Sequence, residues 1–296
     1  MGRTLFGPAD RTQTQLKPWI GRSMSRFSQR LKAASQRTHG CLCVGLDVDL
    51  SKMPAGLPKD GQGALHFCRS IIEATRDLAV AYKPNMAFFE SLGAGGFEVM
   101  ERLRQSVPQD TLFVLDAKRG DIGNTSQAYA KAYYDLLKCD GITLAPYMGK
   151  DSIEPFLDYP DTCSFVLCLT SNPSSADFQF QELKSGGKLY EKVAQEAVGW
   201  ARGKKGEVGL VVGATQTQYL KDLRRRVPDT PFLVPGVGTQ GGDLAGVLKE
   251  GRSQDGFGLL VNVSRQVIYA SQDNNFAEAA RDAAKKLTDE MKPYFS

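Results

Sequence analysis

The apolar stretch Thr111-Leu112-Phe113-Val114-Leu115 runs directly into Asp116-Ala117-Lys118-Arg119-Gly120-Asp121-Ile122-Gly123-Asn124-Thr125. β-Branched and aromatic residues in such a run predict a buried strand. Residues two apart on a strand point to one face, so we expect Asp116 and Lys118 to project together, with Asp121 on the turn that follows. Desolvating these charges is costly unless each is paired. Their concentration at a strand end therefore favours a catalytic role.

Similar apolar runs recur along the chain and alternate with helical patterns. The predicted strands are Cys41–Leu46, Ala79–Lys83, Thr111–Asp116, Gly141–Ala145, Ser164–Leu169, Val208–Gly213, Phe232–Pro235 and Gly256–Val261. The predicted helices are Ala64–Leu78, Phe97–Ser106, Ser126–Lys138, Lys188–Ala201, Gln216–Arg226, Asp243–Lys249 and Phe276–Met291. Eight strand-plus-helix units in roughly 250 residues match the size of a (β/α)8 barrel. We therefore predict an α/β fold, a single-domain (β/α)8 TIM barrel over residues 24–296, with an open doubly wound sheet as the alternative.

The composition limits the class of protein. Of the 296 residues 42% are hydrophobic, enough to bury a sizeable core. The formal net charge of +4 is uneven, because residues 1–39 hold eight Lys/Arg against Asp10 alone and the rest holds 29 basic and 32 acidic residues. This balance argues against a nucleic-acid partner. No apolar run approaches the roughly 20 residues that span a bilayer, so we expect a cytoplasmic protein without a membrane partner.

Residues 1–23 differ from the rest of the chain. They contain Gly, Pro, Thr and Gln with little periodicity, which predicts a mobile N-terminal extension. Their Arg-rich, acid-poor composition also describes an organelle transit peptide, although Pro8 and Pro18 and the missing amphipathic pattern oppose that interpretation. Met24 is an alternative start, because a predicted helix follows it from Arg26 to Ala34.

The cysteines and histidines do not form a metal-binding pattern. The six cysteines are scattered through apolar runs, with neither a CxxC pair nor a zinc spacing. His39 and His66 are the only histidines. We therefore expect buried free thiols, a reducing compartment and no metal site.

Polar residues follow several of the predicted strands. Asp47 ends the first strand, Lys83 ends the second and Thr170-Ser171-Asn172 follows the fifth. A capping Asp or a surface Lys explains any one of them taken singly. Placed together with Asp116 and Lys118 at the carboxyl ends of barrel strands, they predict an active site.

The last two predicted strands end in a different pattern. A glycine-rich loop, Pro235–Asp243, opens one helix, and Ser264-Arg265 opens another. Loops after the seventh and eighth strands form the common phosphate site of barrels. Arg265 can supply a bidentate charge there and Gln240 a hydrogen-bond donor.

These motifs together carry a family resemblance. The chain resembles the orotidine 5′-phosphate decarboxylase family, in the branch whose core motif reads D-A-K-R-G-D-I-G-N-T. The likeness begins near Ser25 and runs, in order, through Gly45-Leu46-Asp47, Lys83-Pro84-Asn85, Asp116–Thr125, Thr170-Ser171-Asn172-Pro173, Pro235–Asp243 and Ser264-Arg265. The resemblance implies a homodimer with active sites at the interface, no metal and no organic cofactor. It also implies decarboxylation of orotidine 5′-monophosphate to uridine 5′-monophosphate and CO2 in de novo pyrimidine biosynthesis.

The same resemblance implies roles for individual residues. The catalytic set would be Lys83, Asp116, Lys118 and Asp121. The substrate-binding set would be Asp47, Thr125, Ser171, Gln240, Ser264 and Arg265. Asp47 and Lys83 would hold the ribose, Ser171 the pyrimidine edge, and Gln240 and Arg265 the phosphate. Asp121 and Thr125 would reach the partner's site.

The chemistry of the motif agrees with this assignment. Loss of CO2 from C6 of orotate leaves a carbanion in the ring plane, which the π-system cannot directly delocalise. A preorganised cation must stabilise it and a proton must be supplied. Lys118, kept charged by Asp116 and Asp121, suits both tasks. Repulsion between Asp116 and the substrate carboxylate is a secondary contribution.

Two other functions remain open from the sequence. One is a magnesium-dependent ketose-phosphate decarboxylase or aldolase of related barrel design, which shares the spaced D-x-K-x-x-D. The continuation G-D-I-G-N-T opposes it. The other is a non-catalytic nucleotide-phosphate-binding barrel, which has no need for the carboxylates of the Lys83-Asp116-Lys118-Asp121 set.

Overall fold

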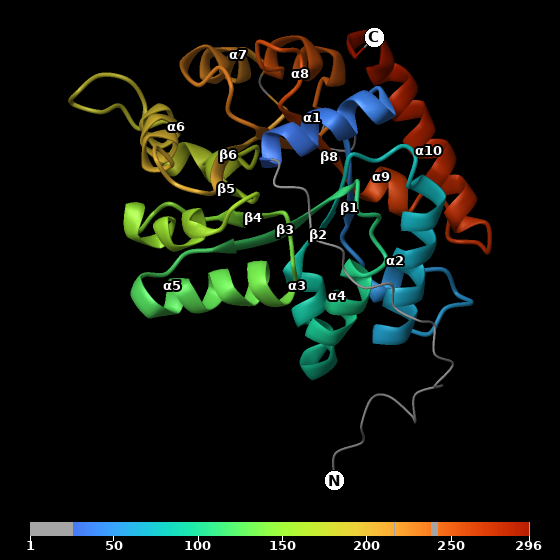
Figure 1. Cartoon of the computed structure of the whole chain (residues 1–296). Helices are drawn as coiled ribbons and strands as arrows, with labels where there is room; N and C mark the ends of the chain where they lie inside the picture. Colours follow the sequence, from blue (N-terminus) through green and yellow to red (C-terminus); the bar gives the residue numbers. More distant parts are fainter. Residues whose placement is uncertain (1–25, 216, 238–241, 296) are drawn as a thin grey trace.

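The predicted barrel is confirmed. The computed structural model describes residues 26–215, 217–237 and 242–295. Within these ranges eight parallel strands close a barrel in the order in which they occur in the sequence (Figure 1). Residues 1–23, predicted as a mobile extension, lie outside the described residues, as does Gln240.

The strands and helices alternate as expected. The strands are β1 Leu42–Leu46, β2 Ala81–Pro84, β3 Leu112–Arg119, β4 Gly141–Leu144, β5 Cys163–Leu169, β6 Glu207–Val212, β7 Phe232–Pro235 and β8 Leu259–Val263. The helices are α1 Phe27–Thr38, α2 Gly61–Thr75, α3 Met86–Glu90, α4 Gly96–Arg104, α5 Gly123–Ala130, α6 Leu189–Trp200, α7 Thr217–Arg226, α8 Leu244–Gly251, α9 Arg265–Ile268 and α10 Phe276–Met291.

Some predicted boundaries are wrong. The eighth strand begins at Leu259 and not at Gly256, because Gly256 and Gly258 have φ angles of +84° and +76°, which belong to turns. Helix α5 begins at Gly123 and continues as a π-helix over Lys131–Leu136. Between β4 and β5 the chain forms 3₁₀-helices, Lys150–Ser152 and Glu154–Asp158, in place of an α-helix.

The core has two layers separated by the barrel wall. The outer layer lies between the strands and the surrounding helices, and the inner layer fills the barrel. Helix α1 closes the amino end of the barrel: Phe27, Leu31 and Ala34 are buried in the inner layer, and the Phe27 ring meets Phe165 edge-on at 5.6 Å. Burying a Phe or Leu side chain stabilises by about 1.5–3 kcal/mol. Because α1 covers the amino end of the barrel, the carboxyl ends of the strands are the end where a site can open to solvent.

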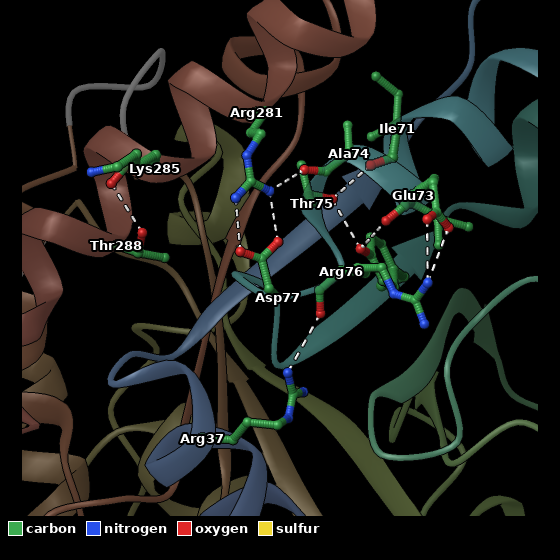
Figure 2. Close-up of polar contacts among 12 residues, drawn as sticks. Arg37, Ile71, Glu73, Ala74, Thr75, Arg76, Asp77, Arg281, Lys285 and Thr288 are labelled. Atoms are coloured by element: carbon green, nitrogen blue, oxygen red, sulfur yellow. Dashed lines mark hydrogen bonds and ion pairs between the residues drawn. The ribbon is translucent and has the colours of Figure 1, made fainter.

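Polar contacts join helices α1 and α10 to the segment that precedes the amino end of β2. Arg281 of α10 donates to both Asp77 oxygens, at 2.6 and 2.8 Å, and to the Ala74 carbonyl at 2.6 Å (Figure 2). Arg37 of α1 donates to the Arg76 carbonyl at 3.4 Å. The last turn of α1 and the first half of α10 are thereby joined to the segment between α2 and β2. Among the described helices, none is both long and apolar enough to cross a membrane.

Candidate active site

A cavity of about 410 Å³ opens at the carboxyl ends of the strands. This volume suits a small organic ligand. The cavity is lined by Asp47, Asp49, Lys52, Lys83, Asn85, Phe88, Asp116, Pro235, Gly236, Val237, Asn262, Ser264, Arg265 and Tyr269. The structure thus brings together residues that follow β1, β2, β3, β7 and β8, as the sequence predicted.

Lys83 is the buried cation of this cavity. Its side chain is 3% exposed, and its Nζ lies 3.1 Å from Asp116 Oδ2 and 3.8 Å from Asp47 Oδ1. Burial alone would lower the pKa of Lys83, but the two carboxylates outweigh that effect and raise it above its ordinary value. Lys83 therefore stays an ammonium that two carboxylates share.

Asp116 lies between two ammonium groups. Its Oδ2 accepts from Lys83, and its Oδ1 accepts from Lys118 Nζ at 2.5 Å. Burial would raise the pKa of Asp116, but Lys83 and Lys118 together hold it well below its usual range. The two lysines and Asp116 thus form a charged array, with Lys83 buried and the Lys118 side chain 49% exposed.

Regular strand alternation does not produce this array. The strand extends beyond its predicted end at Asp116 to Arg119, and its pairing with β4 shifts between Leu115 and Arg119. Lys118 has a φ of +48°, a left-handed conformation that costs a residue with a side chain roughly 1–2 kcal/mol. The predicted proximity of Asp116 and Lys118 is confirmed, but it arises at a bulge in the strand.

Side chains that the sequence analysis missed support this bulge. Thr143 of β4 accepts from the backbone N–H groups of Ala117 and Lys118, both at 3.0 Å, and donates to Asp116 Oδ1 at 3.0 Å. Arg119 donates to Tyr133 Oη at 2.9 Å and forms an ion pair with Glu90. Thr143 is uncharged and lies in the interior of a predicted strand. The only feature that could have marked it as a site residue was its position on the side of that strand that faces the barrel interior.

Asp121 and Thr125 make no hydrogen bond or ion pair with this array within the described residues. Asp121 Oδ1 accepts from the Ile122 backbone N–H at 2.8 Å, and Thr125 lies exposed in the first turn of α5. Within the described residues Asp121 forms no ion pair with Lys118. The anion–cation–anion grouping expected from the motif is therefore present only in part within one chain.

The predicted phosphate-binding residues Ser264 and Arg265 lie next to each other after β8. Ser264 donates to the Gly45 carbonyl at 3.2 Å, and Arg265 is exposed at the start of α9. A Cβ on Gly45 would lie 2.7 Å from Ser264 Cβ, so a side chain there would displace Ser264. Ser264 and Arg265 lie in the predicted cavity.

Ser171 lies in a second, smaller cavity of about 190 Å³. This cavity is formed by the segment after β5, with Gly213 and Thr215 after β6. Ser171 Oγ is buried and has no hydrogen-bond partner among the described residues. Ser171 is thus a free polar group at the strand ends, but it does not line the 410 Å³ cavity.

Two oxygen atoms in the larger cavity also lack a hydrogen bond. Asp47 Oδ1 and Asn262 Oδ1 are buried and accept no hydrogen bond from the described residues. The Tyr269 hydroxyl accepts from the Asp49 N–H at 2.6 Å and donates to the Asp47 carbonyl at 3.0 Å, which fixes the segment after β1. Buried acceptors without donors are costly, so a ligand that donates hydrogen bonds fits here. In the described part of the chain, no cluster of three or more His, Cys, Asp or Glu is arranged to hold a metal ion.

The chain is similar in sequence to a known protein family. A family model described as Orotidine 5′-phosphate decarboxylase / HUMPS family matches residues 40–282. The chain is 49% identical over 264 residues to orotidine 5′-phosphate decarboxylase of Roseiflexus castenholzii, with 89% of this chain and 96% of that protein covered.

Solved structures agree with the sequence relatives. The structure of Leishmania donovani OMP decarboxylase has a TM-score of 0.80 and 41% identity, with 92% of this chain and 99% of that chain covered. Leishmania donovani UMP synthase has a TM-score of 0.81 and 42% identity, with 91% of this chain covered but only 56% of that longer chain.

Proposed function

Because the chain belongs to the orotidine 5′-phosphate decarboxylase / HUMPS family, we propose that it is a carboxy-lyase that converts orotidine 5′-monophosphate to uridine 5′-monophosphate and CO2 in pyrimidine synthesis. The observation that carries this proposal is the Lys83–Asp116–Lys118 array, which lies at the same strand ends as Arg265. Phosphate binding alone would not need a carboxylate held between two ammonium groups.

Lys118 is the group that acts at the reacting carbon. As CO2 leaves C6, negative charge develops there, and a fixed ammonium stabilises that charge more effectively than mobile water does. Lys118 then donates a proton to C6, so the C–CO2 bond is replaced by a C–H bond. Asp116 orients the Lys118 ammonium, and its negative charge opposes that of the substrate carboxylate.

The remaining groups hold the two ends of the substrate. Arg265 and Gln240 bind the phosphate with Ser264 beside them, while Asp47 and Lys83 bind the ribose hydroxyls. Asp47 Oδ1 accepts no hydrogen bond within the described residues, although Lys83 Nζ lies 3.8 Å away. This supports the role, because a ribose hydroxyl can donate to that oxygen. The free Ser171 hydroxyl is suited to the polar edge of the pyrimidine.

The active enzyme is a homodimer in this proposal, with Asp121 and Thr125 completing the partner's site. Large apolar side chains are exposed on the same side as the motif: Ile122, Tyr147, Met148 and Phe178. Tyr147 is 90% exposed and packs edge-on against Phe178 with ring centroids 6.4 Å apart. Exposed apolar groups of this kind mark an interaction surface. The lack of an ion pair between Asp121 and Lys118 within the described residues of one chain supports the same assembly.

The proposed compartment is the cytoplasm. All six cysteines are buried and form no disulfide bond, which suits a reducing environment.

The decisive experiment is turnover of orotidine 5′-monophosphate by the purified chain in excess EDTA, followed through the ultraviolet absorbance of the orotate ring. We expect metal-free formation of uridine 5′-monophosphate. Absence of turnover in EDTA, with magnesium-dependent activity on a ketose phosphate, would assign the chain to the alternative barrel function. Tight binding of uridine 5′-monophosphate without any turnover would favour the non-catalytic binder.

A further inference from the structure

We propose that Thr143 of β4 is a positioning residue for the decarboxylation, acting through the backbone of β3 and the carboxylate of Asp116. This inference rests on the proposed function. The Thr143 hydroxyl accepts from the Ala117 and Lys118 N–H groups and donates to Asp116 Oδ1, each at 3.0 Å. One side chain thus contacts three consecutive residues of the catalytic motif.

The strand register explains why a side chain is needed at this point. Leu115 of β3 pairs with Ile142 of β4, and Arg119 pairs with Leu144. The three β3 residues 116–118 therefore oppose Thr143 alone. Regular pairing cannot supply carbonyl acceptors for the two extra N–H groups, because β4 has no further residues there. The Thr143 oxygen takes their place.

The hydrogen-bonding capacity of Thr143 is fully used. A hydroxyl has one proton to donate and two lone pairs that accept. Both lone pairs face backbone N–H groups, so the proton is directed to Asp116 Oδ1. Thr143 is 1% exposed, and hence water does not substitute easily for its hydroxyl.

This arrangement links Thr143 to the reacting ammonium. Lys118 keeps its left-handed backbone, φ +48°, while its N–H donates to Thr143, and its Nζ lies 2.5 Å from the Asp116 oxygen that Thr143 also contacts. Without the hydroxyl, two partly buried N–H groups lose their acceptor and Asp116 Oδ1 loses a donor. Both the backbone and the side-chain end of Lys118 are then free to shift. Ser264 and Arg265, which follow β8 and belong to the proposed substrate-binding set, make no hydrogen bond to Thr143 among the described contacts.

The test compares Thr143→Val, which keeps the shape and removes the hydroxyl, with Thr143→Ser, which keeps the hydroxyl. A misplacement of about 1 Å at a reacting group can cost about 100-fold in rate, so we expect kcat of Thr143→Val to fall by about that factor. KM for orotidine 5′-monophosphate should change far less, and Thr143→Ser should restore most of kcat. Thr162→Val is the matched control, because that hydroxyl donates to the Tyr159 carbonyl at 2.9 Å at the amino end of β5.

Each outcome bears on the inference. Native kcat in a folded Thr143→Val variant overturns it, as does a fall in kcat that Thr162→Val reproduces. If Thr143→Val does not fold, Thr143→Ala and Thr143→Ser replace it, and equal kcat values for these two overturn the inference. If the native enzyme itself does not turn over orotidine 5′-monophosphate, the proposed function is overturned. Failure of the proposed function is thereby distinguished from failure of the Thr143 inference.

Discussion

Lys118 Nζ lies 2.5 Å from Asp116 Oδ1, although the two residues belong to the same strand and two strand residues span about 6.6 Å. The lysine side chain therefore turns back along β3 toward the carboxylate. Its side chain is 49% exposed, whereas that of Asp116 is 15% exposed. The ammonium end of the pair therefore belongs to a half-exposed side chain, whereas the carboxylate is largely buried.

Replacing Lys118 with Ala should abolish most of the turnover. The variant loses the cation that stabilises charge at C6 and the proton donor, so we expect kcat to fall by at least about 1,000-fold. Affinity for uridine 5′-monophosphate, measured by calorimetry, should fall much less, because the phosphate contacts remain. Lys192→Ala is the matched control, since the Lys192 side chain is 55% exposed and pairs with Glu196 on α6. Near-native kcat in Lys118→Ala would remove Lys118 from the mechanism.

Replacing Lys83 with Met should destabilise the protein in a pH-dependent way. The change leaves Asp47 and Asp116 as neighbouring carboxylates without their shared cation, which should lower the free energy of unfolding at pH 7 by about 3 kcal/mol. The folded-state pKa of Asp116 is lowered, so its contribution to stability is present above about pH 4 and is lost as the pH falls further. The raised pKa of Lys83 keeps its contribution up to about pH 10.

Urea unfolding at pH 7 and pH 3 tests this sign. The difference in the free energy of unfolding between the native protein and Lys83→Met should be smaller at pH 3 than at pH 7. Lys204→Met is a suitable control, because Lys204 also contacts two carboxylates, Glu154 at 2.9 Å and Asp158 at 3.3 Å, but at the surface. A larger difference in the free energy of unfolding at pH 3 than at pH 7 would contradict the stabilising role of the lowered Asp116 pKa.

The strands were predictable because strands of a parallel barrel are buried on both faces and appear as continuous apolar runs. The same feature caused the error at β8, where Phe257 between Gly256 and Gly258 continues the apolar run while both glycines turn the chain. The π-helix over Lys131–Leu136 was predicted as part of the α-helix Ser126–Lys138, since its composition is that of an ordinary helix. No element was predicted where the 3₁₀-helices lie between β4 and β5.

The charged residues of the site were predictable from the sequence. The residues whose role depends on strand pairing and backbone conformation were not. Asp47, Lys83, Asp116 and Arg265 stand out as polar residues after apolar runs. The left-handed Lys118 depends on Thr143, which lies 25 residues further along the chain and meets it only through strand pairing. Asn262 was missed because an uncharged residue within an apolar run has no distinguishing pattern. The proposed role of Asp121 in a partner's site involves a second chain and is not a property of one chain's fold.

Co-expression of two inactive variants should restore activity if Asp121 serves the partner's site. A heterodimer of Lys118→Ala and Asp121→Ala subunits then carries both changes in one site and none in the other. With random pairing, about one quarter of the native turnover should return. Lys118→Ala with Asp116→Asn is the control, since both residues belong to one subunit's site and no heterodimer has an intact one. Recovery in neither pair would place Asp121 in its own subunit's site.

Helix α1 should prove to be part of the barrel domain, because a buried ion pair joins it to the core. Asp140 is fully buried; it pairs with Arg30 of α1, lies 3.9 Å from Arg104 and accepts from the Phe113 N–H at 2.8 Å. Asp140→Asn removes the charge but keeps the shape and leaves Arg30 without its partner, so the free energy of unfolding should fall by about 3 kcal/mol. We expect kcat of the folded variant to be unchanged, because the pair lies at the amino end, away from the cavity.

Asp110→Asn is the matched control for this change. Asp110 also pairs with α1, through Arg37 at 3.1 Å, but its side chain is 62% exposed. An exposed pair contributes less than about 1 kcal/mol, so the two variants should separate clearly in urea unfolding. Amide hydrogen exchange should also show lost protection in α1 of Asp140→Asn before the rest of the barrel opens. Equal stability of the two variants would mean that α1 is attached to the barrel by its apolar face alone.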